Sequence, residues 1–145
     1  MSNGSRVDPY INFRFKIECS GVIEAAFSEV SGLSLEVETE DYVEGGVNNF
    51  VHKLPKGAKT QNLVLKRGLT DKESLWNWGM KSIDAKFEKK NITIFLQDAQ
   101  GQNTTWSWFV QNAYPVKWSG PDLKASSAEI ALETLELAHE GITKN

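Results

Sequence analysis

Apolar and polar residues alternate one by one over several short stretches of this chain, and this period of two constrains the fold more than any other feature. The first stretch alternates apolar with charged residues, and its apolar set is Phe13, Phe15, Ile17 and Cys19. Such alternation predicts a β-strand that buries one face. We expect further strands over residues 22–30, 33–44 and 61–67, with a bulge or tight corner at Ser31–Gly32. The strand at 33–44 is expected to bury three residues: Leu33, Leu35 and Val37.

Residues 92–113 have the pattern of a β-hairpin. Apolar residues alternate on both sides of Asp98–Gly101, where the glycine suits a left-handed position of a short turn. The second strand places three apolar residues on one face: Trp106, Trp108 and Val110. Pro115 then predicts a bulge or a strand break, because proline cannot donate to a strand ladder.

One segment has helical spacing instead. Thr70 and Glu73 have the spacing of a capping box, which predicts a helix over residues 71–86. Its apolar residues recur at helical intervals, and we expect them to pack in the core: Leu75, Trp76, Met80, Ile83 and Phe87.

Residues 126–141 fit two structures. Ser126 and Glu129 again have capping-box spacing, and the residues that follow have high helix propensity. Apolar residues nevertheless alternate with polar ones on both sides of Thr134, and one bulge near Thr134 would join the two halves into a strand. These residues alone leave helix and strand nearly equal.

The predicted elements amount to six or seven strands and one helix, mostly antiparallel because the connections are short. This set favours a mainly β fold, an antiparallel β-barrel or β-sandwich with one α-helix packed on it. At 145 residues the chain is expected to form a single domain over residues 1–145, with a flexible N-terminus over residues 1–8. Its 40% apolar and 24% charged residues are typical of a soluble protein.

Charge and cysteine content exclude several classes. A net charge of −3 argues against a DNA-binding surface as the main function of the monomer. Cys19 is the one cysteine, so no intrachain disulfide can form, and we expect it to be a small buried hydrophobic residue. No apolar run reaches the length of a signal peptide or a membrane span, so assembly in a cytoplasm is expected.

Residues suited to catalysis or metal binding do not gather in the sequence. His52 and His139 share no spacing with other ligand types, so we expect no metal site and no catalytic residues. Glu44–Gly46 lacks the lysine and Ser/Thr of a phosphate-binding loop, and no cofactor is expected. The acidic cluster over Glu36–Asp41 could supply paired acids for glycoside chemistry, but a solvated strand face is the favoured interpretation. We therefore expect no enzyme.

The five tryptophans suggest the main alternative function. Trp76, Trp106 and Trp108 fall on apolar faces of predicted elements, which favours structural burial. Trp78 and Trp118 have no assigned place. A monomeric β-sandwich module that binds carbohydrate through one of these two exposed rings is therefore the alternative.

The segment between Glu44 and Thr60 has neither a regular period nor enough charge to be disordered. Connections of this length are uncommon inside a compact domain and are usually functional, so we expect a contact outside the monomer to hold it. Open sheet edges also promote association. Identical copies that pair edge to edge around a closed rotation form a ring.

An ordered series of segments resembles the tube proteins of contractile phage tails and of phage-tail-like extracellular contractile injection systems. The segments that carry the resemblance are Phe27–Leu33, Tyr42, Glu44–Gly46, Asn49, Lys53–Pro55, Leu65–Gly68, Leu75, Trp76, Trp78, Ala113–Lys117 and Glu129–Gly141. They cover nearly the whole chain. The resemblance favours a strand over the last of them and implies a structural inner-tube subunit that assembles into stacked hexameric rings.

The resemblance also implies where residues lie in such a tube. Strand 33–44 and hairpin 92–113 would belong to the inner barrel, and the candidate lumen-facing residues are Glu36, Glu38, Thr93, Gln97, Thr105 and Ser107. The candidate inter-subunit or inter-ring residues are Gly45, Gly46, Asn49, His52, Lys53 and Leu54. The exposed side of the helix, with Lys72, Lys81 and Lys86, would meet a contractile sheath.

The implied partners are further copies of the chain, the sheath, and baseplate and tube-terminating proteins. The lumen would conduct DNA or effector protein, and an acidic lumen would repel DNA from its wall. The subunit would have no stable membrane association and would assemble in a bacterial cytoplasm, as part of a phage tail or an injection particle. The residues do not distinguish a phage tail from a bacterial injection system.

Overall fold

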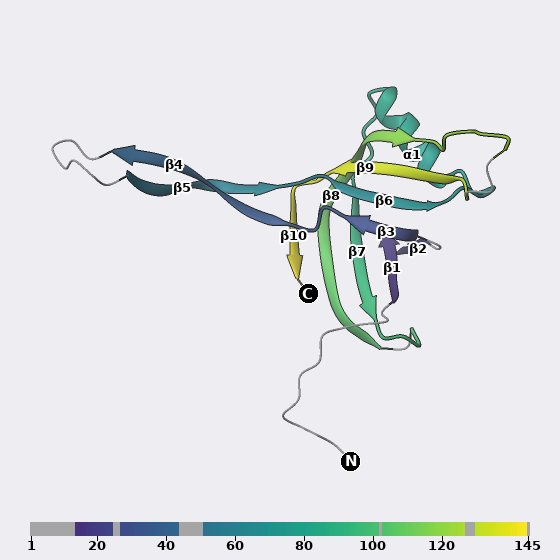
Figure 1. Cartoon of the computed structure of the whole chain (residues 1–145), viewed down its shortest axis with the longest axis horizontal. Coiled ribbons are helices and arrows are strands. Elements are labelled where there is room, and N and C mark those ends of the chain that lie inside the picture. Colours follow the sequence, from purple (N-terminus) through teal and green to yellow (C-terminus); the bar gives the residue numbers. More distant parts are fainter. Residues whose placement is uncertain (1–13, 25–26, 44–50, 102, 127–129, 145) are drawn as a thin grey trace, which may run out of the picture.

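The computed structural model describes residues 14–24, 27–43, 51–101, 103–126 and 130–144. They form ten strands and one helix (Figure 1). In chain order these are β1 (Arg14–Cys19), β2 (Val22–Glu24), β3 (Phe27–Ser31), β4 (Leu35–Val43), β5 (Val51–Thr60), β6 (Leu63–Gly68), α1 (Ser74–Ile83), β7 (Lys90–Gln97), β8 (Thr104–Ser119), β9 (Leu132–Ala138) and β10 (Gly141–Lys144). The predicted flexible N-terminus, residues 1–8, lies outside the described residues.

Eight strands form one antiparallel sheet in the order β2-β1-β7-β8-β9-β6-β3, with β10 also paired to β8. The 16-residue β8 joins its two halves: the first half pairs with β7 and β10, and the second half pairs with β9. The register of β8 and β9 shifts between Pro115 and Lys117. This confirms the bulge alternative predicted at Pro115, and β8 continues through it.

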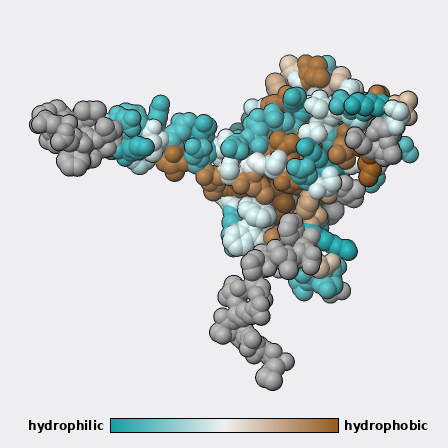
Figure 2. Space-filling model, in the orientation of Figure 1, coloured by the Kyte–Doolittle hydropathy of each residue, from teal (hydrophilic) through white to brown (hydrophobic). Residues whose placement is uncertain are grey.

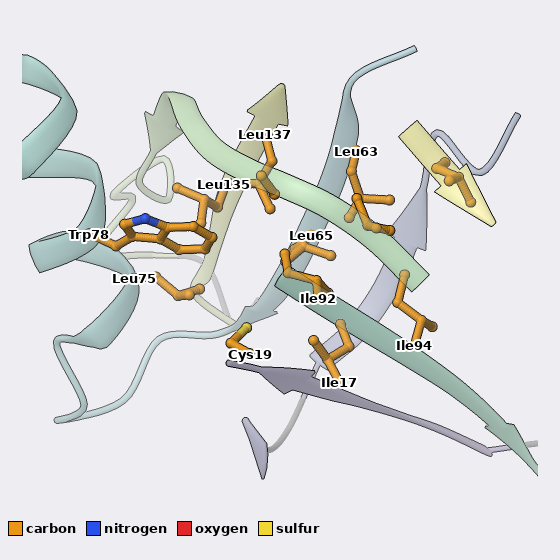
Figure 3. Packing of buried hydrophobic residues seen from close by; sticks show 13 residues of the cluster. Ile17, Cys19, Leu63, Leu65, Leu75, Trp78, Ile92, Ile94, Leu135 and Leu137 are labelled. Atoms are coloured by element: carbon orange, nitrogen blue, oxygen red, sulfur yellow. The ribbon is translucent and has the colours of Figure 1, made fainter. Parts of the chain in front are cut away.

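The core lies between the two halves of this sheet. Ile17, Ile92 and Ile94 come from β1 and β7, and they pack with leucines of β6 and β9 (Figure 3). Leu75 and Trp78 of α1 close the cluster at the helix end (Figure 3). The main features of the fold prediction, an antiparallel β protein with one packed helix, are thus confirmed.

The helix differs from its prediction in both bounds and orientation. The capping box is not formed: Thr70 Oγ1 accepts the amide of Lys72 at 3.2 Å, and Glu73 makes no side-chain cap. The predicted buried stripe is also largely wrong, because Trp76 is 44% and Ile83 75% exposed.

The buried helix positions are Leu75, Trp78 and Gly79. A Cβ atom at Gly79 would lie 3.6 Å from Trp118 Cβ, so the helix packs closely against β8 at this glycine. The close approach turns Leu75 and Trp78 inward and Trp76 outward. Phe87, also expected in the core, lies beyond the helix end and is exposed.

The last segment is a strand over Leu132–Ala138, which confirms the strand alternative. The predicted bulge near Thr134 is wrong, because β9 pairs with β6 in one unbroken register. Glu133 faces the core with Leu135 and Leu137. The alternation only seemed to slip because an acidic residue occupies an inward position.

Glu133 is accommodated by Arg67, directly opposite on β6. Both side chains are 2% exposed, and Arg67 Nε donates to Glu133 Oε2 at 3.1 Å. Trp118 Nε1 donates to the other carboxylate oxygen, and Arg67 Nη2 donates to Ser74 Oγ, both at 3.1 Å. The network therefore ties β6, β8, β9 and α1 together.

The prediction of an irregular connection between Glu44 and Thr60 is partly wrong, because Val51–Thr60 forms the strand β5, which pairs with β4 along its length. Together they form a two-stranded arm that projects from the body (Figure 1). The predicted burial of Leu35 and Val37 is also wrong, because both lie on this arm and are exposed. The strand count reaches ten because residues 22–31 divide into β2 and β3, and because β5 and β10 are added.

Gly32 forms the tight corner that leads into the arm. Its φ is +94°, and a Cβ atom there would lie 2.1 Å from the backbone oxygen of Asn62, which follows the arm. His139 Nε2 lies 2.9 Å from the backbone oxygen of Gln61. The Gly32 corner and the contact of the His139 side chain with the Gln61 oxygen therefore fix the base of the arm to the body.

Candidate assembly surfaces

The layer formed by β1, β7, β8 and β10 has one face on the core and one face away from it. Thr93 lies opposite Phe109, and Ser107 lies opposite Phe95. Residues between them on both strands point into the core, so strand alternation places these four on the face away from it. The structure thus brings two predicted lumen residues together with two aromatic rings, Phe95 and Phe109, which the alternation of the sequence places on the same face.

Gln97 and Thr105 lie at the end of the same hairpin. Gln97 is half-buried and opposite Thr104, while Thr105 is exposed and donates from Oγ1 to the Leu96 oxygen at 3.2 Å. The register shifts between Leu96 and Gln97, so Thr105 is the extra residue of a bulge. Lys16 Nζ lies 5.1 Å from the centre of the Phe95 ring and covers part of this face.

Glu36 and Glu38 do not lie in this layer. They are exposed on β4 of the arm, opposite Lys59 and Gly57 respectively. The four predicted lumen residues on the hairpin are therefore separated from the two glutamates by the fold.

Three of the predicted inter-subunit residues lie on the arm strand β5. Lys53 and Leu54 are exposed, and the backbone of His52 pairs with that of Tyr42. Three more, Gly45, Gly46 and Asn49, lie outside the described residues.

One face of the arm is apolar near the body, and Figure 2 shows hydrophobic residues where the arm meets the body. Leu35 is opposite Thr60 and Val37 is opposite Ala58, and the two aliphatic side chains are 70% and 58% exposed. An isolated two-stranded ribbon is marginally stable in water. The alternation of the sequence did place Leu35 and Val37 on one apolar face, but that face was predicted to pack in the core of the same chain.

The layer of β1, β7, β8 and β10 also has two open borders. Among the described residues, β10 pairs with β8 alone. At the other border β2 pairs with Ile17–Cys19 of β1, which leaves Arg14–Lys16 paired on one side within the described chain. Such borders present backbone groups that favour pairing with another strand.

The helix presents a third surface. Lys72, Lys81 and Lys86 are all exposed, as predicted for this side. Lys81 Nζ donates to Glu88, and this bond holds the pKa of Glu88 below its usual value. A groove of about 430 Å³ lies between α1 and β8, with Trp76 on its wall.

A second carboxylate with a shifted pKa, Glu140, joins the turn before β10 to β8 and to the residue just before β7. Asn112 Nδ2 donates to Glu140 Oε2 at 2.6 Å, and Lys89 Nζ donates to Oε1 at 3.3 Å. These bonds lower the pKa of Glu140, the asparagine more than the lysine.

The described residues contain no group of three or more side chains placed to hold a metal ion. The two tryptophans considered for carbohydrate binding are not open rings. Trp78 is 3% exposed and donates to the Glu88 oxygen at 2.7 Å, while Trp118 is half-buried against Trp76. Within the described chain, no helix has the length and hydropathy needed to cross a lipid bilayer.

The described residues form a β fold with open borders on one layer and an arm that no other described part of the chain covers, and surfaces of this kind favour association through strand edges. The sequence matches the T4-like virus tail tube protein gp19 family over residues 11–143, and the chain belongs to this family. It is a structural subunit of the tail tube of contractile injection systems and a component of a phage tail or injection particle. The family is one of structural tube proteins rather than of enzymes.

Solved structures agree with this assignment. The chain is similar to a chain of the PVC extracellular contractile injection system in its extended sheath–tube complex, with 29% identity, a TM-score of 0.81, and 94% and 91% of the two chains covered. It is also similar to a chain of the tube-terminating cap of the anti-feeding prophage, with 28% identity, a TM-score of 0.85, and 99% and 95% covered.

More distant structures share the fold alone. Hcp1 from Flavobacterium johnsoniae has 18% identity and a TM-score of 0.63, with 90% of this chain and 93% of that chain covered. Among proteins of curated function, no relative matches the sequence.

Proposed function

We propose that the chain forms hexameric rings that stack into a hollow tube, and that the tube conducts DNA or effector protein. The observation that supports this is the pair of open borders on the β1–β7–β8–β10 layer. Each strand of this layer runs antiparallel to the next one in the order β1-β7-β8-β10, so β10 and β1 run in opposite directions. When β10 of one copy meets β1 of the next, the antiparallel pattern continues unbroken, and a repeated head-to-tail contact closes a ring.

The face of this layer that points away from the core would then line the lumen. Thr93, Gln97, Thr105 and Ser107 are the proposed lumen residues on β7 and β8. Because the arm carries Glu36 and Glu38, we assign these two to contacts between copies instead. An acidic lumen is therefore not part of this proposal.

The tip half of the arm would contact a neighbouring copy or the next ring. The residues proposed for this contact are Gly45, Gly46, Asn49, His52, Lys53 and Leu54. The exposed ribbon supports this role, since a partner surface would stabilise a pair of strands that is marginal alone.

The proposed partners follow from the similar structures, which include a sheath–tube complex, a baseplate and a tube-terminating cap. We propose corresponding contacts of this chain with a sheath, through the helix side with Lys72, Lys81 and Lys86, and with baseplate and cap proteins. The chain would act as a single domain, without catalysis, and assemble in a bacterial cytoplasm.

Sedimentation velocity and negative-stain imaging of the purified chain test this proposal. Rings with sixfold symmetry and an open centre, or tubes built from them, are expected. A single species of 16.2 kDa at high protein concentration, with no rings in images, would contradict it.

A further inference from the structure

A cleft of about 800 Å³ opens between β3 and the β1–β7–β8 layer. We call it the β3 cleft. Its walls are mainly apolar and come from both layers: Phe15, Phe27, Val30, Leu33, Leu96 and Trp108. Arg14 and Glu29 add charged groups to the lining. Volumes of roughly 300–1,000 Å³ with apolar walls are typical of binding sites.

The arm offers apolar side chains of matching chemistry. Leu35 and Val37 project from the same face of β4 and have no cover among the described residues of their own chain. Two aliphatic side chains so exposed on a narrow ribbon are a cost that contact with an apolar surface removes.

The arm and the cleft lie where one copy can reach the next. Figure 1 shows the arm extending sideways past β10, whereas β1 and β2 lie at the opposite side of the sheet. If β10 of one copy borders β1 of its neighbour, the arm runs over the neighbour on its β1 side. Arg14 and Phe15 of β1 line the β3 cleft, so the neighbour's cleft includes residues of the border that the arm would cross.

We infer that the Leu35–Val37 face of the arm seats in the β3 cleft of the adjacent copy of this chain. This inference rests on the ring proposed above. It makes the contact heterologous, because one copy donates the arm and the other supplies the cleft, and such contacts close into rings. It also covers the apolar lining of the cleft and braces the ribbon.

Disulfide trapping tests the contact directly. Two proteins are made in a Cys19→Ala background, one with Val37→Cys on the arm and one with Val30→Cys in the cleft, and circular dichroism checks that both fold. They are mixed, assembled and mildly oxidised. A disulfide-linked dimer on a non-reducing gel is expected from the mixture and from neither protein alone.

The matched control replaces the cleft variant with Leu123→Cys, since Leu123 is 86% exposed and does not line the cleft. It should give no dimer with Val37→Cys. Rings seen in images without the Val37–Val30 crosslink would overturn the arm-in-cleft contact and leave the ring proposal intact. Absence of both rings and crosslinks would overturn the two together.

A second test removes the apolar groups. The double variant Leu35→Ser/Val37→Ser should melt as the native chain does when both are monomeric, because neither side chain is buried in the monomer. Its association constant should fall by at least about tenfold per side chain, the value expected when a buried aliphatic contact is lost. Leu123→Ser should leave association unchanged. Equal association of the double variant and the native chain would refute the contact.

Discussion

Glu133→Ala tests how much the buried Arg67–Glu133 ion pair contributes to the stability of the fold. It removes the carboxylate that lies 3.1 Å from Arg67 Nε, so the guanidinium of Arg67, 2% exposed, loses this ion pair. It also removes the acceptor of Trp118 Nε1. Breaking a buried ion pair from one side costs about 3–5 kcal/mol, against a total stability of about 5–15 kcal/mol for a typical domain.

The cost should appear as a large fall in melting temperature. For a chain of this size each kcal/mol corresponds to roughly 3–4 °C, so we expect Tm to fall by about 10–20 °C. Thermal and urea unfolding followed by circular dichroism, at a concentration where the chain is monomeric, measure the change. Glu29→Ala is the matched control, because its exposed pair with Lys66 at 3.6 Å should contribute about 0–1 kcal/mol.

Replacing both partners separates the cost of a lone charge from the value of the pair. Arg67→Met/Glu133→Leu removes both charges, and such replacements are often neutral or stabilising. Trp118 then lacks its acceptor, a loss of about 1–3 kcal/mol that offsets part of the gain. A loss of less than about 1 kcal/mol in Glu133→Ala, or a double variant less stable than Glu133→Ala, would refute the reasoning.

Three further predictions concern the arm and the surface. Gly32→Ala should lower Tm strongly, because φ is +94° and the new Cβ would lie 2.1 Å from the Asn62 oxygen; an unchanged Tm would contradict the tight corner. Asn112→Ala should raise the pKa of Glu140 toward its ordinary value in a carboxyl NMR titration, because it removes the main bond that lowers it. That bond stabilises the fold near neutral pH, and its contribution is lost as the pH falls through the folded-state pKa. Deletion of residues 46–56 should leave a folded chain that forms no tubes in images, and normal tubes would refute the role of the arm.

Local alternation sufficed to predict the strands whose buried side packs within the chain. Ile17 and Cys19 on β1, and Leu63 and Leu65 on β6, are buried as the pattern predicted. The hairpin at residues 92–113 was also predictable, because its turn glycine has a φ of +71° and its strands pair directly.

The wrong predictions share one physical cause. Alternation along a strand shows which residues share a face, but it does not show which other element that face packs against. Leu35 and Val37 have the same alternation as a core strand, yet they lie on the arm. Glu133 breaks the alternation of β9, yet it is buried because Arg67 stands opposite across 66 residues of sequence. Trp78 replaces Trp76 in the core because the helix packs against β8 on the side of Trp78 and Gly79.

The candidate surfaces show the same limit. Thr93 and Ser107, proposed for the lumen, could be placed on one face from the sequence, since their spacing is local, whereas the bulge at Thr105 was not predicted. Glu36 and Glu38 could not, because strand 33–44 pairs with β5 rather than with β7 or β8. No local signal distinguishes these two pairings in the absence of the fold.

The fold also separates the groups that stabilise one copy from those left for association. The Arg67–Glu133 pair lies in the middle of the body and links four elements, so its loss should weaken folding and assembly together. The arm adds exposed apolar area and few contacts to the body, so its changes should alter assembly while the body stays folded. Because Gly32 fixes the base of the arm, the direction of the arm is determined in the monomer before any partner binds. In the proposed ring, a neighbour would cover a ribbon whose direction is already set, which would lower the ordering cost of association.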